Sequence, residues 1–325
     1  MRVQETKYRE VEQRLWQSVE LNPEEHFVPL PRLGTTVRVQ EVGEGSPVLF
    51  IHGGPNSGST WANLVAETHG LKCFLLDRPG TGLSDSYVAK KDTLIDFASH
   101  LVADVLDGLG IDKAHVVASS LGGYCALWSA ASTPERFDRM VQMACPALLP
   151  GQHLPPFMKV LMVPGMRKII GVLPPNKKAQ DSIMRQIGHG ASLDAGTLPP
   201  AHDEWYTALQ RYTNTMRNDG DMIYSVKAKG GFDEEVALDG ETLSRVETPT
   251  HFLWGADDTF GGEDVARWVT ETMPNATLEM IADSGHLPWL DDPAHVGQET
   301  TRFLLKEPLE PATAADLNEN KGGTK

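Results

Sequence analysis

The stretch Ala114-His115-Val116-Val117-Ala118-Ser119-Ser120-Leu121-Gly122-Gly123 decides the fold, because it joins a short apolar strand to a helix through small residues. A nucleophile on such a sharp strand-to-helix turn needs small residues two positions before and two positions after it. Ser120 has Ala118 and Gly122 at these positions, whereas Ser119 would have two bulkier side chains there. Ser120 is therefore the candidate nucleophile, although a serine here could also serve only as the N-cap of the helix.

Strand and helix patterns alternate on both sides of this turn. Apolar runs predict strands over residues 26–30, 36–42, 47–51, 72–76, 114–117, 140–144, 250–254 and 277–281. Helical spacing of apolar residues predicts helices over residues 5–20, 61–67, 94–109, 121–132, 263–273 and 293–305. This alternation implies an α/β fold with a mostly parallel sheet covered on both faces. Ligands of such sheets bind beyond the carboxyl ends of the strands.

The alternation breaks between residues 146 and 247, where prolines and methionines are frequent. Proline punctuates short helices and methionine forms adaptable apolar surface, so we expect a helical cap over residues 146–247. Residues 1–145 and 248–306 are expected to form the core, including an N-terminal helix. The polar segment 307–325 is expected to be a disordered tail. A chain of 325 residues fits such a large domain with an insertion.

A serine hydroxyl is a poor nucleophile and needs a base. His286 follows the predicted strand 277–281, at the edge where chemistry is expected. Its neighbour Gly285 allows the loop to approach other backbone closely. His286 is therefore the candidate base.

The base in turn needs an acceptor that fixes its tautomer and stabilises its cation. The predicted strand 250–254 runs into Gly255-Ala256-Asp257-Asp258, and either aspartate could serve. We favour Asp258, because the turn that Gly255 begins must first clear the sheet edge. The preceding strand is followed by Ala144-Cys145-Pro146, which contains no carboxylate.

Acyl chemistry also needs donors for a tetrahedral oxyanion. One candidate is the backbone N–H of Leu121, directly after the nucleophile. We assign the second to Gly54, in the loop His52-Gly53-Gly54-Pro55 that follows the strand 47–51. His52 is interpreted as bracing this loop rather than as a catalytic residue.

Charge and composition narrow the function classes. The formal net charge of −15 disfavours nucleic acid and anionic membrane surfaces as partners. The three cysteines lie in apolar contexts typical of buried free thiols. No His-Glu-x-x-His or paired Cys-x-x-Cys motif supports a metal, and no cofactor is expected. No signal-like or membrane-spanning run is found, so the expected location is the cytoplasm. The sequence does not determine the oligomeric state.

Taken in order, these motifs resemble the α/β-hydrolase superfamily, from about Thr36 to Leu305. The resemblance also covers Trp61 and the turn Asp77-Arg78-Pro79-Gly80-Thr81-Gly82-Leu83-Ser84, which we interpret as structural. It implies a Ser–His–Asp triad, and Asp258 matches the family's acid position. It further implies a helical cap inserted after the sixth strand. Dehalogenases and epoxide hydrolases of the family carry aspartate where this chain has Ser120, so those chemistries are not expected.

The main hypothesis is a serine hydrolase that cleaves an ester, lactone or similar acyl bond of a small, apolar molecule. Three alternatives stay open. The chain could be an aminopeptidase like proline iminopeptidase, whose motif His52-Gly53-Gly54-Pro55 resembles. It could be a cofactor-free carbon–carbon bond hydrolase, since the same triad performs that reaction. It could also be a ligand receptor built on a hydrolase scaffold.

Overall fold

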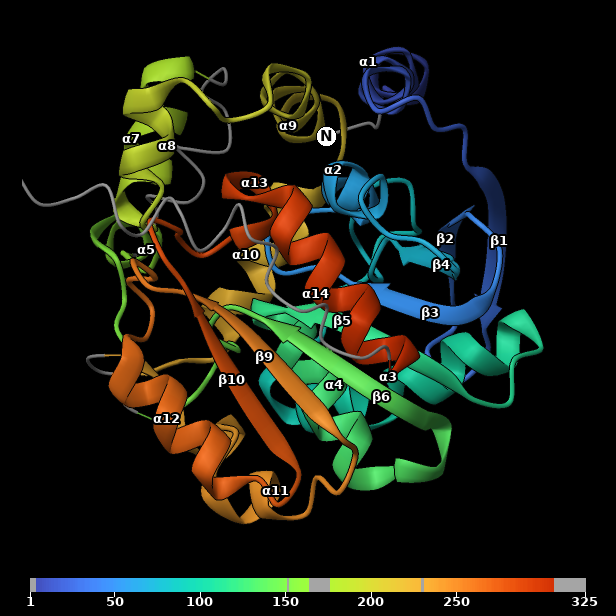
Figure 1. The fold of residues 1–325 in the computed structure, drawn as a ribbon, viewed down its shortest axis with the longest axis vertical. Helices are drawn as coiled ribbons and strands as arrows, with labels where there is room; N and C mark the ends of the chain where they lie inside the picture. Colours follow the sequence, from blue (N-terminus) through green and yellow to red (C-terminus); the bar gives the residue numbers. More distant parts are fainter. Residues whose placement is uncertain (1–3, 151, 164–175, 229–230, 307–325) are drawn as a thin grey trace, which may run out of the picture.

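The computed structural model describes residues 4–150, 152–163, 176–228 and 231–306; the expected tail 307–325 lies outside these ranges. An eight-stranded sheet forms the centre, with strand order β1-β2-β4-β3-β5-β6-β9-β10 (Figure 1). The strands are β1 (Glu24–Leu30), β2 (Thr35–Val42), β3 (Ser46–Ile51), β4 (Leu71–Leu76), β5 (Ala114–Ser119), β6 (Phe137–Met143), β9 (Thr250–Gly255) and β10 (Ala276–Ile281).

Two pairings of this sheet are antiparallel, β1 with β2 and β2 with β4. The other five pairings of this sheet are parallel. Strand order reverses between β3 and β5, because the chain passes from β3 to β4 on one side and later enters β5 on the other. The carboxyl ends of β3 and β5 therefore flank the position where α/β sheets bind ligands.

Helices cover both faces of the sheet, as the alternating pattern predicted. One face packs against α3 (Lys91–Leu109), α4 (Ser120–Ser132), α11 (Gly240–Ser244) and α12 (Glu263–Thr272). The other packs against α1 (Glu5–Ser18), α2 (Ala62–Val65), α13 (Pro288–Asp291) and α14 (Pro293–Leu305). Figure 1 shows α14 in front of the sheet and α4 behind it. Successive side chains of a strand point to opposite faces, so Leu49 and Ile51 join the first core while Val48 and Phe50 join the second.

The segment between β6 and β9 is mostly helical. Its elements are α5 (Pro156–Leu161), α7 (Lys177–Gln186), α8 (Gly190–Ala195), α9 (Pro200–Tyr212) and α10 (Thr215–Ser225). We call α5 together with α7 to α10 the cap. A two-stranded pairing of β7 (Lys227–Ala228) with β8 (Gly231–Phe232) follows α10, within the segment 146–247 where helices were expected. Strands of two residues are too short to carry a periodic pattern, so they could not be predicted from the sequence.

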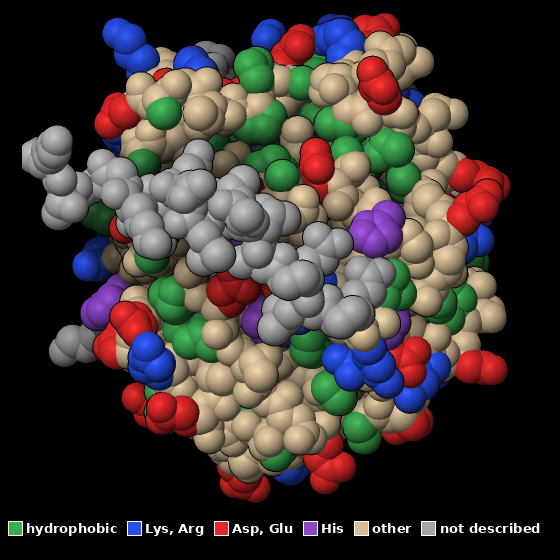
Figure 2. Space-filling view, viewed as in Figure 1, with side chains coloured by type: hydrophobic (Ala, Val, Ile, Leu, Met, Phe, Trp, Pro, Cys, Tyr) green, Lys and Arg blue, Asp and Glu red, His purple; other side chains and the backbone are tan. Residues whose placement is uncertain are grey.

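Short 3₁₀ turns complete the chain: η1 (Gly58–Trp61), η2 (Pro134–Arg136) and η3 (Glu234–Val236). In the described part of the chain, no helix is both long and apolar enough to cross a membrane. Acidic side chains are spread around the face shown in Figure 2 rather than gathered in one patch.

Candidate active site

The turn that carries Ser120 is tightly packed against the end of β3. β5 ends at Ser119 and α4 begins at Ser120, whose backbone φ is +49°. A Cβ on Gly122 would come within 2.1 Å of the Ile51 carbonyl oxygen, so no larger residue fits there. A Cβ on Gly53 would lie 2.8 Å from the Ser120 Cβ. The positive φ is a strained conformation for serine, and this packing holds it in place.

His286 and Asp258 are in direct contact. The His286 Nδ1 lies 2.8 Å from the Asp258 Oδ2, and both residues are buried. The two carboxylate oxygens of Asp258 also accept the backbone N–H groups of Cys145 and Phe260, each at 2.9 Å. The Phe260 ring packs on the His286 ring with centroids 4.3 Å apart. Asp258 is thus fixed from three sides, whereas Asp257 is exposed.

The predicted oxyanion loop lies beside Leu121. A Cβ on Gly54 would lie 3.6 Å from a methyl carbon of Leu121, so the two candidate donors are neighbours. His52 is fully buried; its Nδ1 contacts the Gly53 carbonyl oxygen at 2.6 Å and its Nε2 accepts the Arg78 backbone N–H at 3.2 Å. Burial, and secondarily the Arg78 charge, holds the pKa of His52 well below 6.5. A neutral histidine with these contacts braces the loop.

Arg78 links the loop of His52 and Gly53 to the cap. Its Nε donates to the His52 carbonyl at 2.9 Å and its Nη2 to the Gly53 carbonyl at 3.0 Å. The same Nη2 contacts the Asp219 Oδ2 on α10 at 2.7 Å, with both side chains almost fully buried. Burial raises the pKa of Asp219, and the Arg78 charge opposes that rise. A small cavity is lined by this ion pair, by Leu121 and by mainly apolar side chains, including Tyr87, Val88, Leu94, Phe97 and Met222.

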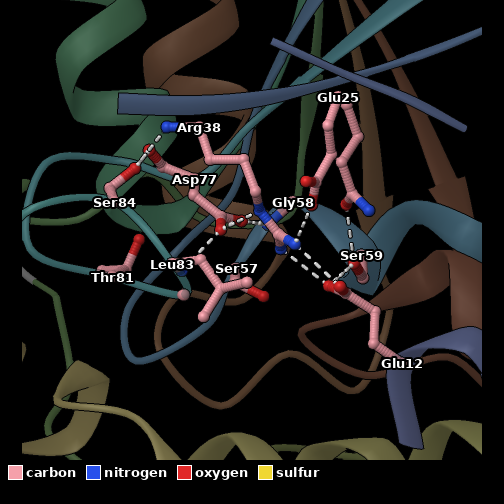
Figure 3. Close-up of polar contacts among 12 residues, drawn as sticks. Glu12, Glu25, Arg38, Ser57, Gly58, Ser59, Asp77, Thr81, Leu83 and Ser84 are labelled. Atoms are coloured by element: carbon pink, nitrogen blue, oxygen red, sulfur yellow. Dashed lines mark hydrogen bonds and ion pairs between the residues drawn. The ribbon is translucent and has the colours of Figure 1, made fainter. Parts of the chain in front are cut away.

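The turn Asp77–Ser84 is anchored by a buried charge network (Figure 3). Arg38 has no solvent exposure and contacts Asp77 Oδ2 at 2.8 Å and both Glu12 oxygens at 2.7 Å. Asp77 also accepts the backbone N–H of Gly58 and that of Leu83. Burial alone would raise the pKa of Glu12, but the charge and hydrogen bonds of Arg38 lower it. The network joins α1, β2 and the ends of the loops that follow β3 and β4, in keeping with a structural role for this turn.

The structure joins His286 to Asp258 by a hydrogen bond and places Gly54 beside Leu121 and Gly53 beside Ser120. Among the described residues, no hydrogen bond joins Ser120 to His286. Ser120, Asp258 and His286 all follow carboxyl ends of strands of one sheet. The sequence interpretation did not foresee the pair Arg78–Asp219 or a second pair, His189–Asp291. Their partners are 141 and 102 residues apart, and no local pattern links such positions.

Comparison with known proteins gives the family. The sequence model for the alpha/beta hydrolase fold matches residues 46–293, most of the chain, and the protein belongs to that family. It is a hydrolase by this membership and by its relatives. One relative, a 2-hydroxy-6-oxononadienedioate/2-hydroxy-6-oxononatrienedioate hydrolase from Burkholderia vietnamiensis, is 29% identical over 288 residues, covering 86% of this chain and 95% of the relative.

Solved structures agree on the fold. The carboxylesterase CesB from Bacillus subtilis superposes with a TM-score of 0.72 at 20% identity, covering 93% of this chain and 98% of that one. The 2-hydroxy-6-oxo-6-phenylhexa-2,4-dienoate hydrolase from Rhodococcus sp. strain RHA1 gives 0.68 at 18% identity, covering 87% and 99%. At these identities the likeness concerns the fold alone.

Proposed function

We propose that this protein is a serine-dependent hydrolase that cleaves a carbon–carbon bond beside the ketone of a small unsaturated oxo acid. The observation that carries the proposal is the similarity to the Burkholderia vietnamiensis hydrolase over 95% of its length. The substrate in that relative's name has carboxylates, a hydroxyl group and a ketone, but no ester or amide. Hydrolysis of such a compound must break a carbon–carbon bond. The proposal therefore adopts carbon–carbon bond hydrolysis, an alternative that the sequence left open, instead of ester cleavage.

The proposed reaction has two steps, and the hydrogen bond between His286 and Asp258 supports the assignment of the base. The Ser120 Oγ adds to the ketone carbon while His286 takes its proton. Asp258, hydrogen-bonded to the His286 Nδ1, stabilises the resulting imidazolium. The backbone N–H groups of Gly54 and Leu121 stabilise the oxyanion.

The bond that breaks distinguishes this chemistry from ester cleavage. When the carbon–carbon bond breaks, its electron pair stays on the leaving carbon and is delocalised into the conjugated oxo acid. That carbon then takes the proton from His286. Water hydrolyses the remaining ester on Ser120, with His286 as base, and the hydroxyl is restored. One water is consumed and a carboxylic acid and a shortened oxo acid are released.

The first test is Ser120→Ala, which should abolish turnover of a 2-hydroxy-6-oxo-dienoate, followed by loss of its absorbance. Removal of a catalytic nucleophile typically lowers kcat by about a million-fold. Ser119→Ala is the matched control, because the Ser119 hydroxyl is buried without a hydrogen-bond partner in the described structure. Its turnover should stay within about twofold of wild type. Full activity in Ser120→Ala would reject the serine mechanism.

A second measurement separates the bond types. Wild-type kcat/KM is compared for three substrates: a 2-hydroxy-6-oxo-dienoate, an aryl ester of the same acyl group, and a proline arylamide. The proposal expects the dienoate to be preferred. Preference for the ester would assign the protein to ester hydrolysis, and preference for the arylamide to aminopeptidase activity.

A further inference from the structure

The loop that carries His286 is held on both flanks by one histidine–aspartate pair outside the predicted triad. On one side of His286, Asp291 Oδ2 accepts the Gly285 backbone N–H at 2.9 Å and the Ser284 hydroxyl at 3.0 Å. On the other side, the Leu287 backbone N–H donates to the His189 Nε2 at 3.2 Å. His189 and Asp291 are themselves joined, with the His189 Nδ1 2.8 Å from Asp291 Oδ2.

These contacts assign the protonation of His189. A backbone N–H can only donate, so the His189 Nε2 must be the acceptor and carries no proton. The Nδ1 then carries the proton and donates it to Asp291. His189 is fully buried, and its partner carboxylate is 4% exposed. A buried imidazole that donates at one nitrogen and accepts at the other has a single orientation available to it.

Asp291 collects four donors. Besides His189, Ser284 and Gly285, the Ser192 hydroxyl donates to its Oδ1 at 2.6 Å. Burial alone would raise the pKa of Asp291, but hydrogen bonding from His189, together with these other donors, lowers it. The carboxylate therefore stays ionised, as acceptance of four hydrogen bonds requires.

The cap contacts the same loop through backbone atoms of the turn between α7 and α8. The His286 N–H donates to the Ile187 carbonyl oxygen at 2.9 Å, in the turn between α7 and α8. A Cβ on Gly285 would lie 2.7 Å from the Gly188 carbonyl carbon, and a Cβ on Gly188 would lie 2.2 Å from the Asp257 carbonyl oxygen. The histidine loop is thus enclosed between the cap turn and the turn that carries Asp258.

We propose that His189 and Asp291 are positioning residues that set the placement of His286 and couple it to the cap. This inference rests on the proposed role of His286 as the base. Neither residue touches the reacting atoms; each acts through the backbone of residues 284–287. Because a displacement of about 1 Å can cost about a hundredfold in rate, loss of these contacts should lower kcat far more than it changes KM.

The test measures kcat, KM and the rate at which a fluorophosphonate probe labels Ser120. His189→Phe keeps an aromatic ring but removes both nitrogens, and labelling and kcat should fall about tenfold to a hundredfold, with KM within about twofold. His189→Gln keeps one donor and one acceptor and should recover a large part of the rate. Recovery by Gln but not by Phe is a result that a purely space-filling role would not produce.

His202→Phe is the matched control, because His202 is another buried histidine of the cap, on α9, packed against Trp205. Its labelling rate should stay near that of wild type. Asp291→Asn tests the opposite flank of the loop and should also slow labelling, so the inference stays testable if His189→Phe does not fold. Circular dichroism and thermal unfolding verify the fold of each variant.

Two failures are distinguishable. If wild-type Ser120 is not labelled at all, the proposed function fails. If wild type is labelled and folded His189→Phe is labelled equally fast, the proposed function stands and the positioning role is overturned. A loss of the same size in His202→Phe would also overturn it.

Discussion

At the residue scale, Gly122 decides how closely the turn that carries Ser120 approaches the backbone of Ile51 and His52. Gly122→Ala would place a Cβ 2.1 Å from the Ile51 carbonyl oxygen and 2.6 Å from that of His52. Both are backbone atoms, so β3 or α4 must shift. We expect a loss of about 1–3 kcal/mol in the free energy of unfolding, measured with urea, and slower fluorophosphonate labelling.

The matched control is Gly231→Ala, because a Cβ there meets nothing within 4 Å. Its stability and labelling should match those of wild type. An unaffected Gly122→Ala variant would mean that the turn tolerates larger residues, and the steric argument for choosing Ser120 over Ser119 would lose its basis.

This steric argument explains why the sharp turn between β5 and α4 could be predicted from sequence. The need for small residues at Ala118 and Gly122 acts within five residues, so it is visible in one stretch. The preference for Asp258 over Asp257 was also local, since it depended on the length of a turn. The surroundings of Asp258 were not accessible, because Cys145, which donates to it, lies 113 residues away.

At the element scale, α10 is fixed to the core through Asp219. Asp219→Asn removes the carboxylate that pairs with Arg78 and leaves a buried guanidinium without a counter-charge. Breaking a buried pair in this way costs about 3–5 kcal/mol. Because Arg78 also holds the His52 and Gly53 carbonyls, kcat should fall together with stability. Urea unfolding and steady-state kinetics measure the two effects.

Asp203→Asn on α9 serves as the comparison for Asp219→Asn. Asp203 pairs with the exposed Lys177, and its own side chain is 31% exposed, so its loss should cost no more than about 1 kcal/mol. Equal losses in the two variants would contradict the view that burial makes the α10 contact important.

The same principle applies to the link between α1 and the sheet. Arg38→Met would leave Glu12 and Asp77 buried without their cation, and about 3–5 kcal/mol of stability should be lost in urea unfolding. The matched control is Arg14→Met, which breaks a surface pair with Glu204 whose side chains are 50% and 56% exposed. A stability change in Arg38→Met as small as in Arg14→Met would show that the network does not anchor α1.

Elements with a long local pattern were predictable, and those defined by tertiary contact were not. The strands of the central sheet and α14 match the expected segments within a few residues, because buried apolar runs and helical spacing are local signals. The four-residue helix α13 was not predicted, yet it supplies Asp291 to the histidine loop. Such a short helix is fixed by its contacts rather than by periodicity.

At the scale of the whole molecule, the alternation of strand and helix patterns was enough to predict the fold class. The contacts between segments distant in sequence could not be predicted in this way. α14 and the edge strand β10 meet through titratable side chains. Glu279 on β10 lies 2.6 Å from the His295 Nε2 on α14 and 3.8 Å from the His251 Nε2 on β9. Nothing local in the sequence marks these residues as partners.

We call the contacts of Glu279 with His251 and His295 the seam between β10 and α14. The seam makes the free energy of unfolding depend on pH. The neighbouring side chains of His251 and His295 lower the pKa of Glu279 from 4.5 to about 2. A carboxyl whose pKa is lower in the folded state stabilises the fold above its unfolded pKa, and that contribution disappears as pH falls through the folded pKa. Glu279→Gln should therefore be less stable than wild type at pH 5 and above. The difference should shrink between pH 4.5 and about 2.

Urea unfolding from pH 3 to pH 7 measures this difference. Glu279 is 32% exposed, so solvent screening limits the expected loss to about 1 kcal/mol. The chain has a net charge of −15, and removal of any carboxylate also relieves general repulsion. Glu271→Gln on α12 removes the same charge from an exposed position and corrects for that relief. If the two variants follow the same pH curve, the seam between β10 and α14 contributes no specific stabilisation, and the packing of apolar side chains alone holds α14 on the sheet.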